Sequence, residues 1–159
     1  MLYIFDVDGT LISSYMDAPN RNYDDWQVLP GRLERLQQLL QDGQQIAFAT
    51  NQAGVAFGHV TEQQVMDKLH QVRDQLQLPA DTRIKACYAH ARARSYKYRA
   101  PEQVARRKPS GAMLRELAAE LPAAAADGVV YVGDRPEDKA AAEDAGATFI
   151  WVDEFFGTY

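Results

Sequence analysis

Five short apolar runs are spaced along the chain, with longer stretches of mixed character between them. The runs span residues 2–5, 46–50, 84–88, 129–132 and 148–152, and several are bounded by Gly, Pro or Asp. Short continuous apolar runs between turn-forming residues are typical of buried strands. The pattern therefore predicts five buried strands.

Helical patterns lie between the predicted strands. Apolar residues recur every three or four positions in residues 33–40, which Gly43 follows as a stop signal, and again in residues 65–76. Thr61, with Gln64 three residues later, forms a capping-box pattern ahead of the second stretch. Both stretches are predicted to be helices.

Two further helices are predicted in the second half of the chain. Ser110 is suited to cap a helix that contains three leucines, and Pro136 suits the first position of a helix that ends at Gly146. The alanine-rich residues 123–126 are expected to form a surface connection, and residues 89–107 are the least regular stretch.

The alternation of strands and helices predicts the fold class. Strand–helix–strand units have right-handed crossovers and give a mainly parallel sheet with helices on both faces. We therefore expect an α/β, Rossmann-like three-layer fold that forms a single domain over residues 1–159. Loops at the carboxyl ends of the strands should form the functional site, and the candidate residues below follow strands or begin helices.

Composition is consistent with one globular domain. Of the 159 residues, 47% are hydrophobic and 25% are charged, which is enough for a real core. The first apolar run ends at Asp6 before any pattern of a secretory signal, and no run approaches a membrane span. The single cysteine, Cys87, excludes an intramolecular disulfide, so we expect a cytoplasmic protein without a membrane partner.

The net charge of −5 hides an asymmetry. Residues 83–108 contain nine of the 17 Lys and Arg residues and one acid, Glu102, so this segment carries about +8. The rest of the chain holds eight basic and 21 acidic residues, about −13. The basic segment is therefore a local feature that needs a local explanation.

Asp6 and Asp8 follow the first predicted strand in the segment FDVDGTL. Residues two apart in an extended chain face the same way, which would place both carboxylates on one side, and Gly9 permits a sharp departure. A turn rich in Asp and Gly at a strand end is also common for conformational reasons alone. The pair by itself does not decide between a turn and a catalytic site.

Three other loops supply further polar residues. Thr50 and Asn51 follow the second strand, Asp134 and Asp138 follow the fourth, and Lys108 precedes the third helix. Each has an ordinary structural explanation when taken alone; for example, the helix dipole favours an acid such as Asp138 in a first helical turn. Together they place acids, a hydroxyl and an amine in loops of the same kind.

In this combination the chain resembles the haloacid dehalogenase-like superfamily of phosphotransferases. Its four motifs are an Asp-x-Asp pair, a Thr or Ser, a Lys and a late acidic pair, and all four occur in order between Asp6 and Gly146. The segments TNQAGVA and RKPSGAML and the small size are most similar to the branch that contains histidinol-phosphate phosphatases, heptose-bisphosphate phosphatases and polynucleotide 3′-phosphatases. The resemblance implies a Mg²⁺-dependent phosphatase.

The resemblance also implies a role for each acid. Asp6 would be the nucleophile that forms an aspartyl-phosphate, and Asp8 would protonate the leaving oxygen and then deprotonate the attacking water. Mg²⁺ would bind Asp6, the Asp8 backbone carbonyl and Asp134, with Asp138 binding directly or orienting a water. An acid at Asp8 favours ester hydrolysis, because the superfamily's dehalogenases and ion-pumping ATPases lack it.

The remaining motif residues would bind the phosphoryl group. Thr50 would donate its hydroxyl, Asn51 its backbone amide, and Lys108 would bridge the phosphate and Asp6. Phosphate esters are already negative, so a carboxylate can attack phosphorus only where cations neutralise the charge. Mg²⁺ and Lys108 are expected to do this.

Two departures from larger relatives bear on the substrate. Many superfamily members insert a cap domain between motifs, but residues 11–45 and 52–107 are too short to hold one, so we expect an open, capless site. Heptose-bisphosphate phosphatases often bind zinc through Cys-x-His followed by Cys-x-Cys, whereas this chain has only Cys87 and His90. No zinc is expected.

Residues 89–107 form a candidate substrate loop, in which basic side chains alternate with Tyr and His. Its candidate anion-binding residues are Arg92, Arg94, Lys97, Arg99 and Arg107. Such a mixture can bind phosphates and stack on sugars or bases, although it can also be a solvated loop that pairs with the acidic body. The expected partner is an anionic sugar phosphate, a bisphosphate or a similar small metabolite.

A nucleic-acid end that carries a 3′-phosphate is the alternative substrate, although the overall charge of −5 argues against extensive duplex binding. Two non-enzymatic functions also share parts of the pattern. Phospho-acceptor receiver domains use an acid after the third strand, where this chain has none, and an inactive scaffold would not need the intact motifs.

Oligomeric state is open between monomer and homodimer. The aromatic residues near the C-terminus are the best candidate contact patch: Trp151, Phe155, Phe156 and Tyr159. Alternatively, these aromatics seal the last edge of the sheet.

Overall fold

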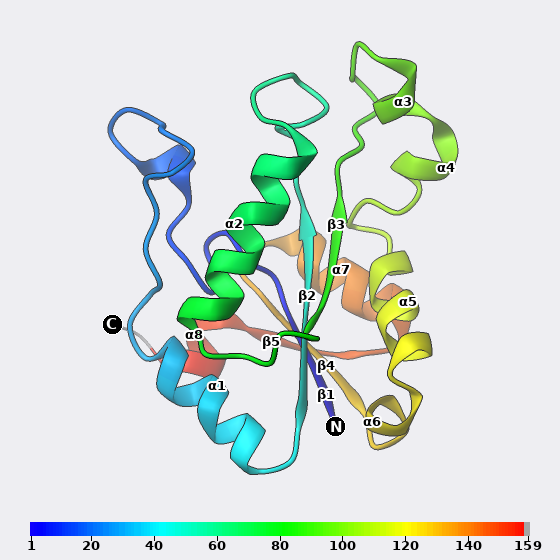
Figure 1. The fold of residues 1–159 in the computed structure, drawn as a ribbon. Coiled ribbons are helices and arrows are strands. Elements are labelled where there is room, and N and C mark those ends of the chain that lie inside the picture. The colour runs from blue at the N-terminus through cyan, green and yellow to red at the C-terminus, as the bar shows by residue number, and fades with distance from the viewer. Residues whose placement is uncertain (158–159) are drawn as a thin grey trace.

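In the computed structural model, which describes residues 1–157, five strands form one sheet between two layers of helices (Figure 1). The strands are β1 (Leu2–Phe5), β2 (Gln45–Asn51), β3 (Arg83–Cys87), β4 (Val129–Gly133) and β5 (Thr148–Trp151). Their order is β3-β2-β1-β4-β5, and every neighbouring pair is parallel. The predicted α/β fold is confirmed, and each predicted strand agrees with the observed one to within one residue at each end.

Helices cover both faces of the sheet. Figure 1 shows one layer made of α1 (Arg32–Gln41), α2 (Glu62–Gln75) and α8 (Val152–Phe156), and an opposite layer made of α5 (Ala112–Glu120), α6 (Pro122–Ala126) and α7 (Pro136–Ala145). The loops also contain a 3-10 turn (Tyr15–Asp17) and two single-turn helices, α3 (Tyr96–Arg99) and α4 (Pro101–Val104). None of the helices in residues 1–157 is long and apolar enough to cross a membrane.

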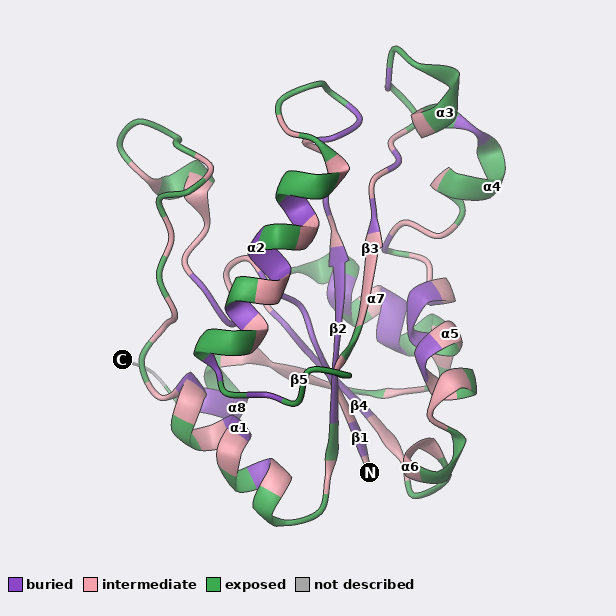
Figure 2. Cartoon of the chain, viewed as in Figure 1, coloured by how far each residue is buried: buried purple, intermediate pink, exposed green. Residues whose placement is uncertain are grey.

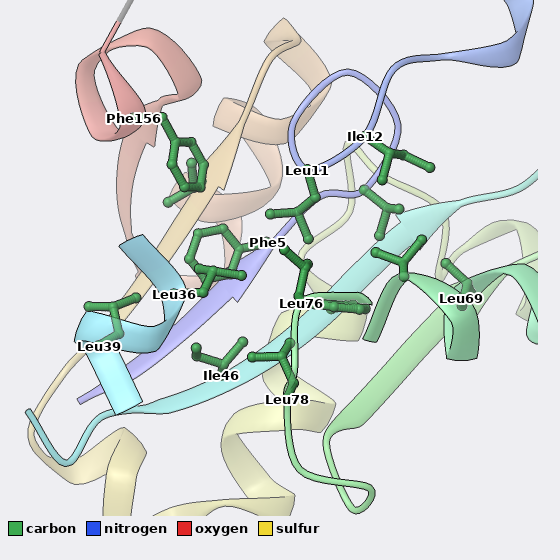
Figure 3. Packing of buried hydrophobic residues seen from close by; sticks show 14 of the residues in the cluster. Phe5, Leu11, Ile12, Leu36, Leu39, Ile46, Leu69, Leu76, Leu78 and Phe156 are labelled. Atoms are coloured by element: carbon green, nitrogen blue, oxygen red, sulfur yellow. The ribbon is translucent and has the colours of Figure 1, made fainter. Parts of the chain in front are cut away.

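The alternation of side chains along β1 divides the core into two clusters. Leu2 and Ile4 pack with α5 and α7, whereas Phe5 packs on the other face with α1, α2 and α8. Figure 3 shows the second cluster, in which Phe5 lies between Leu36 and Leu76. In Figure 2 most of β1, β2 and β4 is buried, while exposed residues dominate the loops.

Two local predictions need correction. Residues 123–126 lie at the surface, as expected, but they belong to a short helix, α6, which Pro122 begins. The cap of α5 is Gly111 rather than Ser110, whose hydroxyl instead accepts a hydrogen bond from the Ala112 amide at 3.2 Å. A Cβ at Gly111 would lie 2.7 Å from the Ala141 carbonyl oxygen, so close packing of α5 on α7 requires glycine at this position.

The C-terminal aromatics cover a face of the sheet rather than its last edge. The ring centroid of Phe155 lies 5.5 Å from that of Phe5 and 5.9 Å from that of Tyr3, both on the central strand. Phe156 is also buried, and the Arg32 guanidinium lies 4.3 Å from its ring centroid. Trp151 is half-buried on β5, and the predicted Tyr159 lies outside the described residues.

The sheet topology determines where the loops converge. The chain moves outward from β1 to β2 and β3, then returns to the other side of β1 for β4 and β5. Such a reversal leaves a crevice at the carboxyl ends of the strands. Figure 1 shows three loops at this end, residues 13–28, 52–60 and 89–107. Between residues 11 and 107 the structure contains no separately folded cap.

Candidate active site

A cleft of about 460 Å³ opens at the carboxyl end of the sheet. The loop candidate Arg107 lines it, and so do six of the predicted motif residues: Asp6, Asp8, Thr50, Asn51, Lys108 and Asp138. Residues 14–16 and 52–54 form the adjoining walls, together with Arg107, Pro109, Arg135 and Glu137. The topology therefore brings segments from across the chain into one polar cavity.

Lys108 lies at the centre of the polar contacts. Its side chain is 5% exposed, and Nζ lies 3.0 Å from Asp6 Oδ1 and 2.6 Å from Asp138 Oδ1. The same ammonium donates to the Tyr131 hydroxyl at 2.7 Å, and that hydroxyl donates to the Ala49 carbonyl oxygen at 2.9 Å. A buried ammonium is tolerated only when paired and hydrogen-bonded, and this one meets both conditions.

Asn51 fixes the backbone that carries Lys108. Its side-chain amide donates to the Lys108 carbonyl oxygen, its side-chain oxygen accepts from the Lys108 amide, and both distances are 3.1 Å. This reciprocal pair ties the loop before α5 to the end of β2. The side chain of Asn51 thus positions Lys108, a role that is separate from the backbone contact with phosphate that the resemblance implied.

Three carboxylates from two strand ends converge beside Lys108. Asp6, Asp134 and Asp138 each offer an oxygen within 4.8 Å of the others. The Thr10 hydroxyl lies 3.3 Å from Asp6 Oδ2 and 3.5 Å from Asp134 Oδ1. Gly9 has a φ of +82°, and a Cβ there would lie 2.3 Å from Asp134 Oδ2, so only glycine lets the two strand ends approach this closely.

Burial perturbs the ionisation of this cluster. Burial raises the pKa of Asp6 to about 8, despite the opposing charge of Lys108 and with a further increase from Asp138. Burial also raises the pKa of Asp134. For Lys108, burial alone would lower the pKa, but the charges of Asp6, Tyr131 and Asp138 outweigh it and hold the pKa well above its ordinary value.

Asp138 has a structural role in addition to its place in the cluster. Its Oδ2 accepts hydrogen bonds from the backbone amides of Asp134 and Arg135, at 3.2 and 3.1 Å, in the first turn of α7. Its Oδ1 faces Lys108. The side chain therefore fixes both the start of α7 and the ammonium group.

The strand β1 ends at Phe5, but the Asp6 amide still donates to the Val132 carbonyl oxygen of β4, and both motif acids line the cleft. After Val7 the chain turns tightly, because the amides of residues 10–12 all donate to the Val7 carbonyl oxygen. Asp6 points to Lys108, whereas Asp8 meets different partners. The Gln52 amide donates to Asp8 Oδ2 at 2.9 Å, and Lys68 Nζ lies 3.3 Å from Asp8 Oδ1.

The sequence did not identify four of the residues that hold the site together: Thr10, Gln52, Lys68 and Tyr131. Gln52 also donates to the Thr50 hydroxyl at 2.9 Å. One signal could have revealed Lys68, because it lies on the buried stripe of α2 beside Leu69. A lysine on an apolar helical stripe requires an anionic partner.

The basic segment largely pairs with the protein's own acids. Arg106 makes two hydrogen bonds to Glu116, at 2.9 and 2.8 Å, and Lys85 lies 2.5 Å from Glu120. Lys97 pairs with Glu62 at 3.1 Å.

The five candidates of the substrate loop differ in their positions. Arg99 donates to the backbone carbonyls of Ala93 and Arg94, and the side chains of Arg92 and Arg94 are exposed. Of the five, Arg107 alone lines the cleft, and its guanidinium donates to the Ala89 carbonyl oxygen at 3.5 Å.

Comparisons with known proteins agree with this geometry. A family model described as "Polynucleotide kinase 3 phosphatase" matches residues 1–156. An uncharacterized 20.8 kDa protein of Autographa californica nuclear polyhedrosis virus is 32% identical over 133 residues, which cover 82% of this chain and 63% of the viral protein. This chain therefore spans less than two thirds of that relative.

Two comparisons concern a named enzyme. The D-glycero-β-D-manno-heptose-1,7-bisphosphate 7-phosphatase of Bordetella bronchiseptica is 32% identical over 148 residues, which cover 91% of this chain and 76% of the enzyme. The crystal structure of the D,D-heptose 1,7-bisphosphate phosphatase from B. bronchiseptica, complexed with magnesium and phosphate, matches with a TM-score of 0.68 and 28% identity. That match covers 93% of this chain and 78% of the enzyme.

The parallel fold, the acidic site and these relatives define a haloacid dehalogenase-like phosphatase without an inserted cap in residues 1–157. The chain belongs to the polynucleotide kinase 3 phosphatase family. The named relatives are phosphatases, so the two non-enzymatic interpretations of the sequence are set aside.

Proposed function

We propose that this protein is a Mg²⁺-dependent phosphomonoester hydrolase that forms an aspartyl-phosphate on Asp6. The observation that carries the proposal is the 3.0 Å contact between Lys108 Nζ and Asp6 Oδ1 in a cleft that Asp8 also lines. A carboxylate approaches a negative phosphoryl group only where a cation reduces the repulsion. The ammonium is in place to do so.

The donor set fits a divalent cation. The three carboxylates of Asp6, Asp134 and Asp138 face the single ammonium of Lys108, which leaves two negative charges when all are ionised. Carboxylate oxygens are the ligands that Mg²⁺ prefers. When bound, Mg²⁺ would neutralise these charges and polarise the phosphoryl oxygens.

The residues of the chain have separate catalytic roles. Asp6 attacks phosphorus while Lys108 and the Thr50 hydroxyl stabilise the phosphoryl oxygens. Asp8 protonates the leaving oxygen, and the alcohol departs. Asp8 then takes a proton from the water that attacks the aspartyl-phosphate, which regenerates Asp6 and releases phosphate.

We further propose a small sugar phosphate or bisphosphate as the substrate. The heptose-bisphosphate phosphatases at about 30% identity support this class. The pairing of Arg106 with Glu116 and of Lys97 with Glu62 reduces the positive charge available for a nucleic-acid backbone. A polynucleotide 3′-end is the second candidate, which the description of the matching family favours.

A hydrolysis panel tests these proposals. Phosphate release is measured from sugar bisphosphates, histidinol phosphate, nucleotides and 3′-phosphorylated oligonucleotides, each with Mg²⁺ or with EDTA. We expect turnover of sugar phosphates that EDTA abolishes and Mg²⁺ restores, and a loss of roughly 10⁴-fold or more in Asp6→Asn. Turnover that survives EDTA, or full activity in Asp6→Asn, would overturn the mechanism. Activity confined to oligonucleotides would replace the substrate class.

A further inference from the structure

Lys68 is a buried cation outside the motifs. It lies on α2, its side chain is 3% exposed, and its neighbours on the buried stripe are Val65, Leu69 and Val72. Its ammonium lies 3.3 Å from Asp8 Oδ1, across 60 residues of sequence. Burying an ammonium costs several kcal/mol unless partners compensate. The ion pair with Asp8, a residue of the candidate site, therefore offsets part of the cost of burying Lys68.

Two aromatic rings also contact this ammonium. Lys68 Nζ lies 4.2 Å from the ring centroid of Tyr23 and 5.0 Å from that of Tyr15, within the range of cation–π attraction. The two rings meet edge to face with centroids 5.0 Å apart. Tyr15 also lines the cleft. The ammonium thus contacts both the loop of residues 13–28, which contributes to the wall of the cleft, and the second motif acid.

Both carboxylate oxygens of Asp8 contact a donor, which restricts the orientation of its side chain. Lys68 approaches Oδ1, while Gln52 donates to Oδ2 and also to the Thr50 hydroxyl. Asp8 is only partly buried, with a side-chain exposure of 24%, so packing alone does not fix it. Its orientation relative to Thr50 therefore depends on these two donors.

We propose that Lys68 is a positioning residue that holds Asp8 in the orientation required for proton transfer to the leaving oxygen. This inference rests on the proposed function, in which Asp8 is the acid. The rings of Tyr15 and Tyr23 in turn hold Lys68. A merely structural lysine would support the fold without favouring one class of leaving group over another.

Leaving groups of different basicity separate these two roles. An alkoxide departs only when it is protonated, whereas p-nitrophenolate departs with little help, and kcat/KM reports the steps up to the loss of the leaving group. For Lys68→Met we expect kcat/KM for β-glycerophosphate to fall by roughly 10²-fold. The value for p-nitrophenyl phosphate should fall only a few-fold. Equal losses on both substrates would overturn the inference.

Lys85→Met is the matched control. Lys85 lies on β3, outside the cleft lining, and pairs with Glu120 of α5, so its replacement should leave the ratio of the two kcat/KM values unchanged. The double variant Lys68→Met with Asp8→Asn should show no larger change in that ratio than Asp8→Asn alone, because both substitutions act on the same proton transfer. A ratio in the double variant equal to the product of the two single effects would contradict the inference.

Asp8→Asn also separates the inference from the function on which it rests. If Asp8→Asn discriminates between the substrates and Lys68→Met does not, the positioning role fails and the proposed function stands. If Asp8→Asn does not discriminate, the acid role of Asp8 itself fails.

Should Lys68→Met not fold, Tyr23→Leu removes one ring from the ammonium and keeps the ion pair. We expect a several-fold selective loss on β-glycerophosphate, compared with none in the exposed control Tyr96→Leu. An equal effect of Tyr23→Leu on both substrates would overturn the proposal.

Discussion

Lys108 Nζ lies 3.0 Å from Asp6 Oδ1, although 102 residues separate the two in the chain. The contact joins the end of the central strand β1 to the loop before α5. Asn51, at the end of β2, holds the backbone of that loop through two hydrogen bonds. The relationship is therefore a product of parallel topology, in which neighbouring strand ends meet at one edge of the sheet.

Replacing the buried Lys108 should reduce activity while the protein remains folded. Lys108→Met removes the ammonium that faces both Asp6 and Asp138, so we expect kcat/KM to fall by roughly 10³-fold or more. Lys139→Met, at an exposed position on α7, is the control and should keep wild-type activity. Steady-state kinetics on p-nitrophenyl phosphate measure both, and circular dichroism verifies the fold. A folded Lys108→Met with near-normal turnover would rule out the proposed role.

Two glycines with similar backbone conformations provide a matched pair. Gly9 and Gly43 have φ values of +82° and +78°, but a Cβ at Gly9 would lie 2.3 Å from Asp134 Oδ2, whereas one at Gly43 would meet nothing within 4 Å. Both substitutions to Ala carry the backbone strain of roughly 1 kcal/mol. Only Gly9→Ala should also displace Asp134, so we expect it alone to lose most of its activity. Thermal melts and kcat/KM on both variants make the comparison, and a similar loss of kcat/KM in Gly43→Ala would contradict it.

The stability of the metal-free protein should decrease with pH. Burial raises the pKa of Asp6 from its ordinary value of 3.8 to about 8, so the folded state holds a proton that the unfolded state releases. The protonated Asp6 carboxyl contributes stability that is fully present below about pH 4 and is lost as the pH rises through about 8. We therefore expect Tm in EDTA to fall between pH 5 and pH 8, with a smaller fall in Asp6→Asn.

Added Mg²⁺ should reverse this trend, because it replaces the proton on the carboxylates. The rise in Tm on adding Mg²⁺ should be larger at pH 8 than at pH 5. The difference between wild type and Asp6→Asn isolates this carboxyl from the histidines. An equal Mg²⁺ effect at both pH values, or a Tm that rises from pH 5 to pH 8 in EDTA, would contradict the prediction.

The apolar runs predicted the sheet because each buried strand must be apolar along its whole length when helices cover both faces. The errors arose where local signals compete. Residues 123–126 are four alanines, whose strong helix propensity after Pro122 outweighs their place between two elements. Ser110 was assigned as a cap from its type alone, but the N-cap of α5 is Gly111, where a Cβ would lie 2.7 Å from the Ala141 carbonyl oxygen.

The location of candidate residues was predictable at the carboxyl ends of strands: Asp6 and Asp134 follow β1 and β4, whereas Thr50, predicted to follow its strand, lies within β2. It was not predictable where function depends on side chains from distant elements. Nothing local to Lys68 or Tyr131 shows which carboxylate each will meet, because that depends on how α2 and β4 pack beside β1.

The basic segment illustrates the same limit. Its charge was evident, but the sequence could not show that Arg106 pairs with Glu116 while Arg107, its neighbour, lines the cleft. Side-chain direction at successive residues depends on the local backbone, and a charge count carries no such information. Of the five loop candidates, the structure places only Arg107 at the cleft.

Chemical trapping of the phosphoenzyme tests the central claim most directly. The variant Asp8→Asn should still transfer phosphate from ³²P-labelled p-nitrophenyl phosphate to Asp6, because this leaving group needs little protonation, but it should hydrolyse the product slowly. Acid quenching should preserve the protein-bound ³²P in one sample. In a parallel sample, borohydride reduction releases the phosphate and converts the phosphorylated Asp to homoserine, which peptide mass spectrometry should find at position 6. Label on any other residue, or turnover without label at Asp6, would contradict the account.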